Sequence, residues 1–180
     1  SPEGDSITLP TTFTTGNYPN GSTIAWWSKI SQAQPNGQCI LFGATTIAHV
    51  EFKSEGTSSP YFRTEAAYHN GYSFGTGTIP GGSLVGRWAH FAIVFDFTVS
   101  PRQVLWYHDG SLFHTHSNFD NGNSGTGEQF YFNKIGRSTG TSSYLYSQSF
   151  KGCISNFLIY DYPLAAGEVR QNYIASKSRR

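Results

Sequence analysis

One stretch decides the fold class of this 180-residue chain: Val104-Leu-Trp-Tyr-His-Asp-Gly-Ser-Leu-Phe-His-Thr-His116. Apolar and polar residues alternate on both sides of Asp109-Gly110, and this dipeptide suits a two-residue type I′ turn, in which both central residues need a positive φ. The stretch therefore predicts a hairpin of two antiparallel strands. A turn of this length pairs His108 with Ser111, Tyr107 with Leu112, Trp106 with Phe113 and Leu105 with His114. This register puts Val104, Trp106 and Phe113 on one face, and Tyr107, His114 and His116 on the other.

The same alternation recurs along the chain, interrupted by Gly, Pro and Asn at intervals of about 8 to 12 residues. Trp88–Asp96 is apolar on both faces, which is typical of a strand in the middle of a covered sheet. One helix is expected over Leu164–Ala175, because Pro163 precedes an inward apolar stripe. The expected strands are 7–9, 23–30, 38–44, 48–53, 61–68, 72–76, 88–96, 104–108, 111–117, 129–136 and 150–160. Together they predict an all-β fold: a two-sheet antiparallel jelly-roll β-sandwich with one short C-terminal helix.

The composition restricts the class of protein. The chain has 4 Trp, 11 Tyr and 14 Phe, only 13% charged residues and a formal net charge of +1. These values exclude a disordered chain and argue against nucleic-acid binding, which needs a basic surface. No apolar run reaches the roughly 18 residues that cross a bilayer, so membrane insertion is not expected. The chain contains no Met, and we expect residues 1–180 to be a single domain excised from a longer extracellular protein.

Two tryptophans, Trp26 and Trp27, are adjacent within the expected strand 23–30. Side chains of neighbouring strand residues point to opposite faces. One of the two rings is therefore expected in the core. The other is either covered by the opposite layer, which is favoured, or exposed as a platform on which a ligand could stack.

Four segments, in order, resemble the laminin-G-like and pentraxin-like branch of the concanavalin A-like lectin/glucanase superfamily. They are 22–28 with its paired Trp, 88–96 with Trp-x-His-x-Ala-x-x-x-Asp, 106–110 with Tyr-x-Asp-Gly, and 150–160 followed by Pro163-Leu164 and Glu168-Val169. The resemblance implies a concanavalin A-like sandwich of the class of extracellular glycan-binding or adhesion modules. The chain departs from the pentraxins at 90–95, where it lacks their Cys and Trp.

Because that pentraxin cysteine is absent, Cys39 has Cys153 as its one possible disulfide partner. Two buried free thiols are the alternative. A disulfide would fit the location that the resemblance implies, which is extracellular, secreted or at a virion or cell surface.

A glycan would lie on the outer, concave face of such a sandwich, so polar and aromatic residues that share a face are candidates for binding. Sugars stack on aromatic rings and bind fixed polar groups. Ordinary cross-strand pairing of surface residues is the alternative. The candidate ligand-binding residues are Tyr61, Arg63 and Glu65 on one strand, Tyr107, His114 and His116 on the hairpin, and Tyr131 and Asn133 on the strand 129–136.

Metal ligands are sparse. His114 and His116 have the i, i+2 spacing that places two imidazoles side by side, but no third ligand is near them in the sequence. Asp120 and Asn121 could supply oxygen ligands to calcium, which takes about 6 to 8 of them. Calcium is the one cofactor that the sequence raises.

Enzymes on this fold give the remaining alternatives. The Glu-rich strand motifs that carry the two carboxylates of retaining glycosidases are absent. Arg63-Thr-Glu65 and Tyr131-Phe-Asn-Lys-Ile-Gly136 resemble motifs of jelly-roll alginate lyases, whose Gln-Ile/Val-His motif is missing. We therefore predict a non-catalytic module that binds a glycan. A protein-binding adhesion domain with a cell-surface or extracellular protein partner is the first alternative, and a polysaccharide lyase or glycoside hydrolase is the second.

Overall fold

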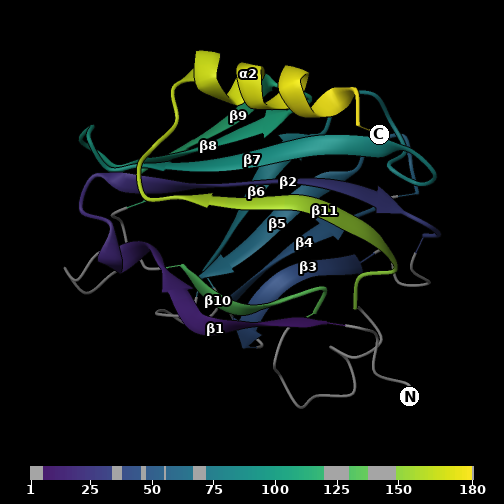
Figure 1. Cartoon of the computed structure of the whole chain (residues 1–180), viewed down its shortest axis with the longest axis horizontal. Coiled ribbons are helices and arrows are strands. Elements are labelled where there is room, and N and C mark those ends of the chain that lie inside the picture. The colour runs from purple at the N-terminus through teal and green to yellow at the C-terminus, as the bar shows by residue number, and fades with distance from the viewer. Residues whose placement is uncertain are drawn as a thin grey trace.

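Two antiparallel β-sheets pack face to face in a computed structural model of the chain, and one helix lies outside them (Figure 1). The structure describes residues 6–33, 38–45, 48–54, 56–66, 72–119, 130–137 and 149–179. The predicted two-sheet sandwich with a C-terminal helix is confirmed.

The strands divide into a six-stranded and a five-stranded sheet. The first strand, β1 (Ile7–Thr14), extends beyond the predicted 7–9. It is an edge strand, where the missing N–H of Pro10 is tolerated. The six-stranded sheet has the order β1 (Ile7–Thr14), β10 (Tyr131–Ile135), β3 (Gln38–Thr45), β4 (Ala48–Lys53), β5 (Tyr61–Ala66), β6 (Tyr72–Thr78). The five-stranded sheet has the order β11 (Gly152–Tyr160), β2 (Gly21–Ile30), β7 (Trp88–Asp96), β8 (Gln103–His108), β9 (Ser111–Ser117), and the helices are η1 (Thr15–Asn17) and α2 (Ala166–Lys177).

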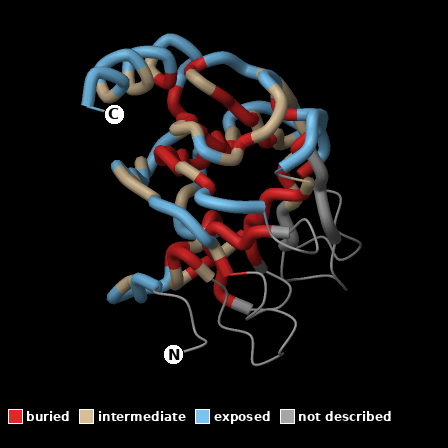
Figure 2. The backbone as a smooth tube through the Cα atoms, turned by 90° about the vertical axis from the view of Figure 1, so that its right-hand side faces the viewer, coloured by how far each residue is buried: buried red, intermediate tan, exposed pale blue. Residues whose placement is uncertain are grey.

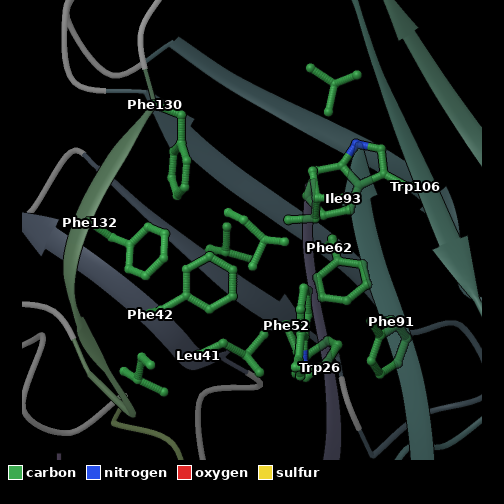
Figure 3. Packing of buried hydrophobic residues seen from close by; sticks show 14 of the residues in the cluster. Trp26, Leu41, Phe42, Phe52, Phe62, Phe91, Ile93, Trp106, Phe130 and Phe132 are labelled. Carbon is green, nitrogen blue, oxygen red and sulfur yellow. The ribbon is translucent and has the colours of Figure 1, made fainter. Parts of the chain in front are cut away.

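The core between the sheets is built largely from aromatic rings (Figure 3). Trp26 of β2 is fully buried, and its ring centroid lies 5.2 Å from that of Phe42 and 5.7 Å from that of Phe91. Phe62 of β5 also joins the sheets, with its ring edge-on to Trp26 at 6.0 Å and stacked on Trp106 at 5.0 Å. Figure 2 shows the buried segments running through the middle of the molecule. Each such ring pair adds about 0.5–1.5 kcal/mol beyond its buried area.

The hairpin has the predicted turn but not the predicted register throughout. Asp109 and Gly110 have φ values of 47° and 76°, as a type I′ turn requires. Tyr107 pairs with Leu112 as predicted, but a bulge follows, and Trp106 pairs with His114 instead of Phe113. The bulge lets Phe113 pack against the core, with its ring 6.4 Å from that of Phe62. The prediction that His114 and His116 share a face with Tyr107 is therefore wrong, because they pair with the core residues Trp106 and Val104, respectively.

The helix α2 covers the outer face of the five-stranded sheet (Figure 1). Val169 of α2 and Leu164 before it pack against Ala92 and Tyr107 in a second, smaller apolar cluster. The helix begins two residues later than predicted, where the Glu168 carboxylate accepts a hydrogen bond from the backbone N–H of Ala165 at 2.8 Å. This arrangement satisfies one of the N–H groups left free at a helix start.

The two cysteines do not form a disulfide, and the prediction of a bridge is wrong for this structure. Both thiols are free: Cys39 is buried and Cys153 is exposed. Cys39 belongs to the core between the sheets. Ile154, the residue after Cys153, packs against that same core, so Cys153 points to the outside of the other sheet. One thiol is therefore inside the sandwich and the other outside it.

The contact between the hairpin turn and α2 can be tested at Gly110. A methyl group at this position would lie 3.0 Å from Cδ1 of Tyr173, whereas one at Gly82, which also has a positive φ of 72°, would touch nothing within 4 Å. We expect Gly82→Ala to lower the free energy of unfolding by about 1 kcal/mol, the cost of a left-handed alanine. Gly110→Ala should lower it by a further ~1–3 kcal/mol through overpacking. Urea unfolding measures both, and equal losses would show that α2 does not pack on the turn.

Candidate functional site

The outer face of the six-stranded sheet carries a group of charged and aromatic side chains. β4 buries Val50 and Phe52 in the core, so the residues that alternate with them point outward. On the neighbouring β5, Arg63 lies opposite Glu51, and Tyr61 lies opposite Lys53. We call this group the Glu51 face; its members are His49, Glu51, Lys53, Tyr61 and Arg63.

Three cationic or basic groups surround one oxygen of Glu51. Oε1 lies 3.2 Å from Nζ of Lys53, 3.5 Å from Nη1 of Arg63 and 3.9 Å from Nε2 of His49. The Glu51 side chain is 1% exposed and that of Arg63 is 34% exposed. The other oxygen, Oε2, has no hydrogen-bond partner among the residues that the structure describes. The face is therefore buried along β4 and accessible along β5.

The charge state of Glu51 follows from its neighbours. Burial raises the pKa of this carboxyl group, but the hydrogen bond and charge of His49 and the charge of Lys53 outweigh burial, and the net pKa is lowered. Glu51 is therefore a carboxylate at neutral pH. Its partners hold the ionised form in place by charge-assisted hydrogen bonds.

Two of the predicted binding residues lie on this face. Tyr61 and Arg63 are half-buried side by side with the charged group. The backbone of Glu65 lies opposite His49, and its side chain is outside the described part of the chain. Tyr131 and Asn133 flank the core residue Phe132 and therefore point outward from β10, which β3 separates from β4. Their role in binding stays a prediction.

The hairpin candidates lie elsewhere. Tyr107 is 3% exposed in the apolar cluster beneath α2, so it does not line the outer face of the six-stranded sheet. His114 and His116 lie on β9, which is in contact with β6 at one side of the sandwich. Burial lowers the pKa of both histidines, and the charge of His114 lowers that of His116 further. The eight candidates therefore do not form one site.

The metal predictions remain untested. Asp120 and Asn121 lie outside the described residues. In the part of the chain that is described, no group of three His, Cys, Asp or Glu residues could hold a metal ion. Calcium at the loop after β9 stays a prediction.

His49, Glu51 and Lys53 are not among the binding residues predicted from the sequence. Their signal is present in Ala48–Lys53, where polar residues alternate with Val50 and Phe52. What the sequence did not supply is the register of β4 against β5, which brings Arg63 next to Glu51. A carboxylate with two cationic neighbours becomes visible as a site only after that pairing is known.

A second buried polar group lies on the outer side of the five-stranded sheet. The His90 ring packs against both Trp27 and Tyr173, with centroid distances of 5.4 and 5.9 Å, and those two rings also stack on each other. The backbone N–H of His90 donates to Oδ1 of Asp109 at 2.9 Å. Burial lowers the pKa of His90 to about 4, against the opposing effect of the Asp109 charge. The imidazole is therefore neutral at pH 7.

Two antiparallel sheets around an aromatic core, with a C-terminal helix on the five-stranded sheet, define a concanavalin A-like sandwich. The chain belongs to the concanavalin A-like lectin/glucanase superfamily, whose family model matches residues 1–170. No curated protein sequence gives a significant match. None of the helices in the described residues is long and apolar enough to cross a membrane.

Solved structures with the same fold include three that differ in function. A native heptameric SAP-like pentraxin from Limulus polyphemus has 16% identity and a TM-score of 0.64, over 94% of this chain and 75% of that one. A Trypanosoma rangeli sialidase has 16% identity and a TM-score of 0.60, over 91% and 24% of the two chains. Botulinum neurotoxin type C, whose cell entry depends on two ganglioside molecules, has 15% identity and a TM-score of 0.57, over 96% and 45%. The chain spans less than half of the last two, and these identities show the fold alone.

Removal of the Glu51 charge should destabilise the protein. Glu51→Gln leaves Lys53 and Arg63 without their carboxylate, and breaking a buried ion pair costs about 3 kcal/mol or more. The exposed Asp161→Asn is the control and should change the free energy of unfolding by less than about 0.5 kcal/mol. Because the folded pKa of Glu51 is lowered, its contribution exists above the unfolded pKa and disappears as the pH falls through the folded pKa. Denaturant unfolding at pH 7 measures the free energy of unfolding of each variant. A Glu51→Gln variant as stable as the wild type would contradict the ion-pair group around Glu51.

The neutral state of His90 predicts a second acid-sensitive step. A histidine with a folded pKa below its unfolded pKa of about 6.5 destabilises the fold as the pH falls, because the unfolded chain binds the proton first. Between pH 6.5 and 4 this loss amounts to about 3 kcal/mol. His90→Phe keeps a ring against Trp27 and Tyr173 and should flatten the decline in unfolding free energy over this range. A pH profile identical to wild type would show that folding does not lower the pKa of His90.

Proposed function

We propose that the chain is a non-catalytic carbohydrate-binding module, and that its ligand lies on the Glu51 face along β5. The observation that carries this proposal is the ion-pair group that holds Arg63 beside Tyr61 on the outer face of the six-stranded sheet. An aromatic ring offers a stacking surface for the C–H groups of a sugar, and a guanidinium offers a fixed set of donors to its oxygens.

The geometry favours binding because the polar groups are held in place before a ligand arrives. Glu51 anchors Lys53 and Arg63 from below, through contacts of 3.2 and 3.5 Å. Both side chains would otherwise lose rotamer freedom on binding, at about 0.5–1.5 kcal/mol each. Pre-organisation of this kind supports recognition of a polar, hydroxyl-rich ligand.

The carboxylates on this face support the non-catalytic part of the proposal. Glycosidases use two carboxyl groups, about 5–5.5 Å apart in retaining enzymes and 6.5–9.5 Å apart in inverting ones. Glu51 is ionised and paired with cations, whereas a general acid needs a raised pKa. The second carboxyl group of this face is that of Glu65, whose side chain is outside the described part of the chain.

The relatives are consistent with a binding module. The type C neurotoxin structure describes interaction with gangliosides, which are glycolipids. The sialidase matches this chain over 24% of its own length, so the likeness extends to one part of that enzyme. Neither likeness specifies a sugar for this chain.

A glycan array tests the proposal. Wild-type protein should bind one group of glycans, and Arg63→Ala and Tyr61→Ala should each weaken that binding about tenfold or more, because a hydrogen bond to a charged group contributes about 1.5–3 kcal/mol. Arg170→Ala removes an exposed arginine of α2 and is the matched control. Thermal unfolding of each variant checks that the fold is intact.

Other outcomes would overturn the proposal. Full glycan binding by Arg63→Ala and Tyr61→Ala would exclude the Glu51 face. If the protein binds no glycan on the array but captures a protein partner, an adhesion domain is favoured. Absorbance from unsaturated uronates on incubation with alginate would establish a lyase.

A further inference from the structure

A cavity of about 310 Å³ lies on the opposite side of the molecule from the Glu51 face, between the five-stranded sheet and α2. Its lining includes Trp27 and His90 from the sheet, Asn156 and Leu158 from β11, and Asn172 and Arg179 from the end of the chain. Figure 1 shows α2 running across the outer side of this sheet. A cavity of this volume is at the lower end of the range of about 300–1,000 Å³ that is typical of small-molecule sites.

The walls of this cavity are held by specific contacts. The indole N–H of Trp27 donates to Oγ of Ser176 at 2.8 Å, and Tyr173 stacks on Trp27 with centroids 5.8 Å apart. On β11, a bulge between Ser155 and Leu158 interrupts the pairing with β2, and Asn156 within it has a φ of 48°. Bulges re-aim side chains next to functional sites. The bulge in β11 and the contacts of Trp27 with Ser176 and Tyr173 of α2 therefore define the walls of the cavity.

The lining contains polar groups that the described protein does not satisfy. His90 is 3% exposed, and its Nδ1 has no hydrogen-bond partner among the described residues. This nitrogen is itself buried, so it makes the surroundings of the cavity polar without being open to a ligand. Asn172, another residue of the lining, donates its amide N–H to the hydroxyl of Tyr160 at 2.9 Å.

The described residues that line the cavity carry positive charge and no negative charge. Arg179 is the one residue with a permanent formal charge among those that line the cavity, and no acidic residue lines it. Leu158, which is 43% exposed, supplies an apolar surface at the cavity wall. An arginine, two amide side chains, a neutral imidazole and an apolar wall together match a small molecule with one carboxylate, several hydroxyl groups and a C–H face.

We propose that this cavity binds a sugar acid of monosaccharide size, with its carboxylate at Arg179 and its hydroxyl groups at the lining amides of Asn156 and Asn172. The site is separate from the Glu51 face, and its occupation does not depend on the function proposed for that face. The ligand is either a free sugar acid or the terminal acidic residue of a glycan.

The test uses the complete chain and sodium D-glucuronate, followed by NMR signals of the Trp27 indole N–H and the His90 ring. Glucuronate should shift these signals in a saturable way. Glucose, which lacks the charge, and acetate, which lacks the hydroxyl groups, should bind at least about tenfold more weakly. A glycan that ends in glucuronic acid gives the second arm: equal binding points to a terminal residue, and loss of binding points to the free acid.

Three variants locate the ligand. Arg179→Gln removes the charge at an exposed position, and Asn156→Gly removes the amide where the positive φ suits glycine. Each should weaken glucuronate binding about tenfold, which corresponds to about 1.4 kcal/mol. Arg170→Gln, on α2 but outside the lining, should have no effect.

Several results would overturn the proposal: no shift with glucuronate, equal shifts with glucose, or unchanged binding by Arg179→Gln and Asn156→Gly. Arg63→Ala separates the two sites. Loss of the glucuronate response in Arg63→Ala would place the ligand on the Glu51 face and contradict this cavity. If Arg63→Ala still responds to glucuronate and the wild-type protein binds no glycan on the array, the cavity proposal is supported and the proposed function is contradicted.

Discussion

The pairing of β2 with β7 is the constraint on which the rest of the structure depends. Nine consecutive residue pairs, from Gly21–Asp96 to Lys29–Trp88, join the two strands without a bulge. Both strands are buried on both faces, so each face needs a covering layer. Trp26 faces the six-stranded sheet across the core, and Trp27 faces α2. The six-stranded sheet therefore covers one face of this apolar strand pair, and α2 covers the other.

The sequence predicts this part of the fold well because its signals are local. Alternation marks the strands, Asp109-Gly110 marks the turn, and the adjacent tryptophans favour two covered faces. The bulge after the turn is different, since it depends on the position of Phe62 in the other sheet, against which Phe113 packs. That contact is not encoded in the alternation of either strand. The wrong face for His114 follows from this single tertiary contact.

The candidate site shows the same division between local and tertiary information. Tyr61 and Arg63 were predicted to share an outward face, and the alternation of one strand was enough for that. Tyr107 also alternates outward from the core, but the helix that buries it is distant in the chain, so its burial could not be foreseen. Glu51 became a candidate only when the register of β4 against β5 placed Arg63 beside it. The sequence of one strand predicts which of its side chains share a face. The residues that lie beside them on the next strand are known only when the pairing of the strands in the sheet is known.

The two sides of the sandwich use different interactions, and this difference bears on where recognition would occur. Transfer of Glu51 and Lys53 from water costs several kcal/mol per ion, so apolar residues there would stabilise the sheet at least as well. What the ion-pair group supplies is position, because Glu51 Oε1 holds Arg63 Nη1 at 3.5 Å and leaves a third of that side chain accessible. On the helix side, stacked Trp27 and Tyr173 supply stability, and the polar groups are left over around a cavity. A ligand on the first side would meet groups that are already ordered by ion pairs, whereas a ligand on the second would meet amide side chains and an arginine around a cavity.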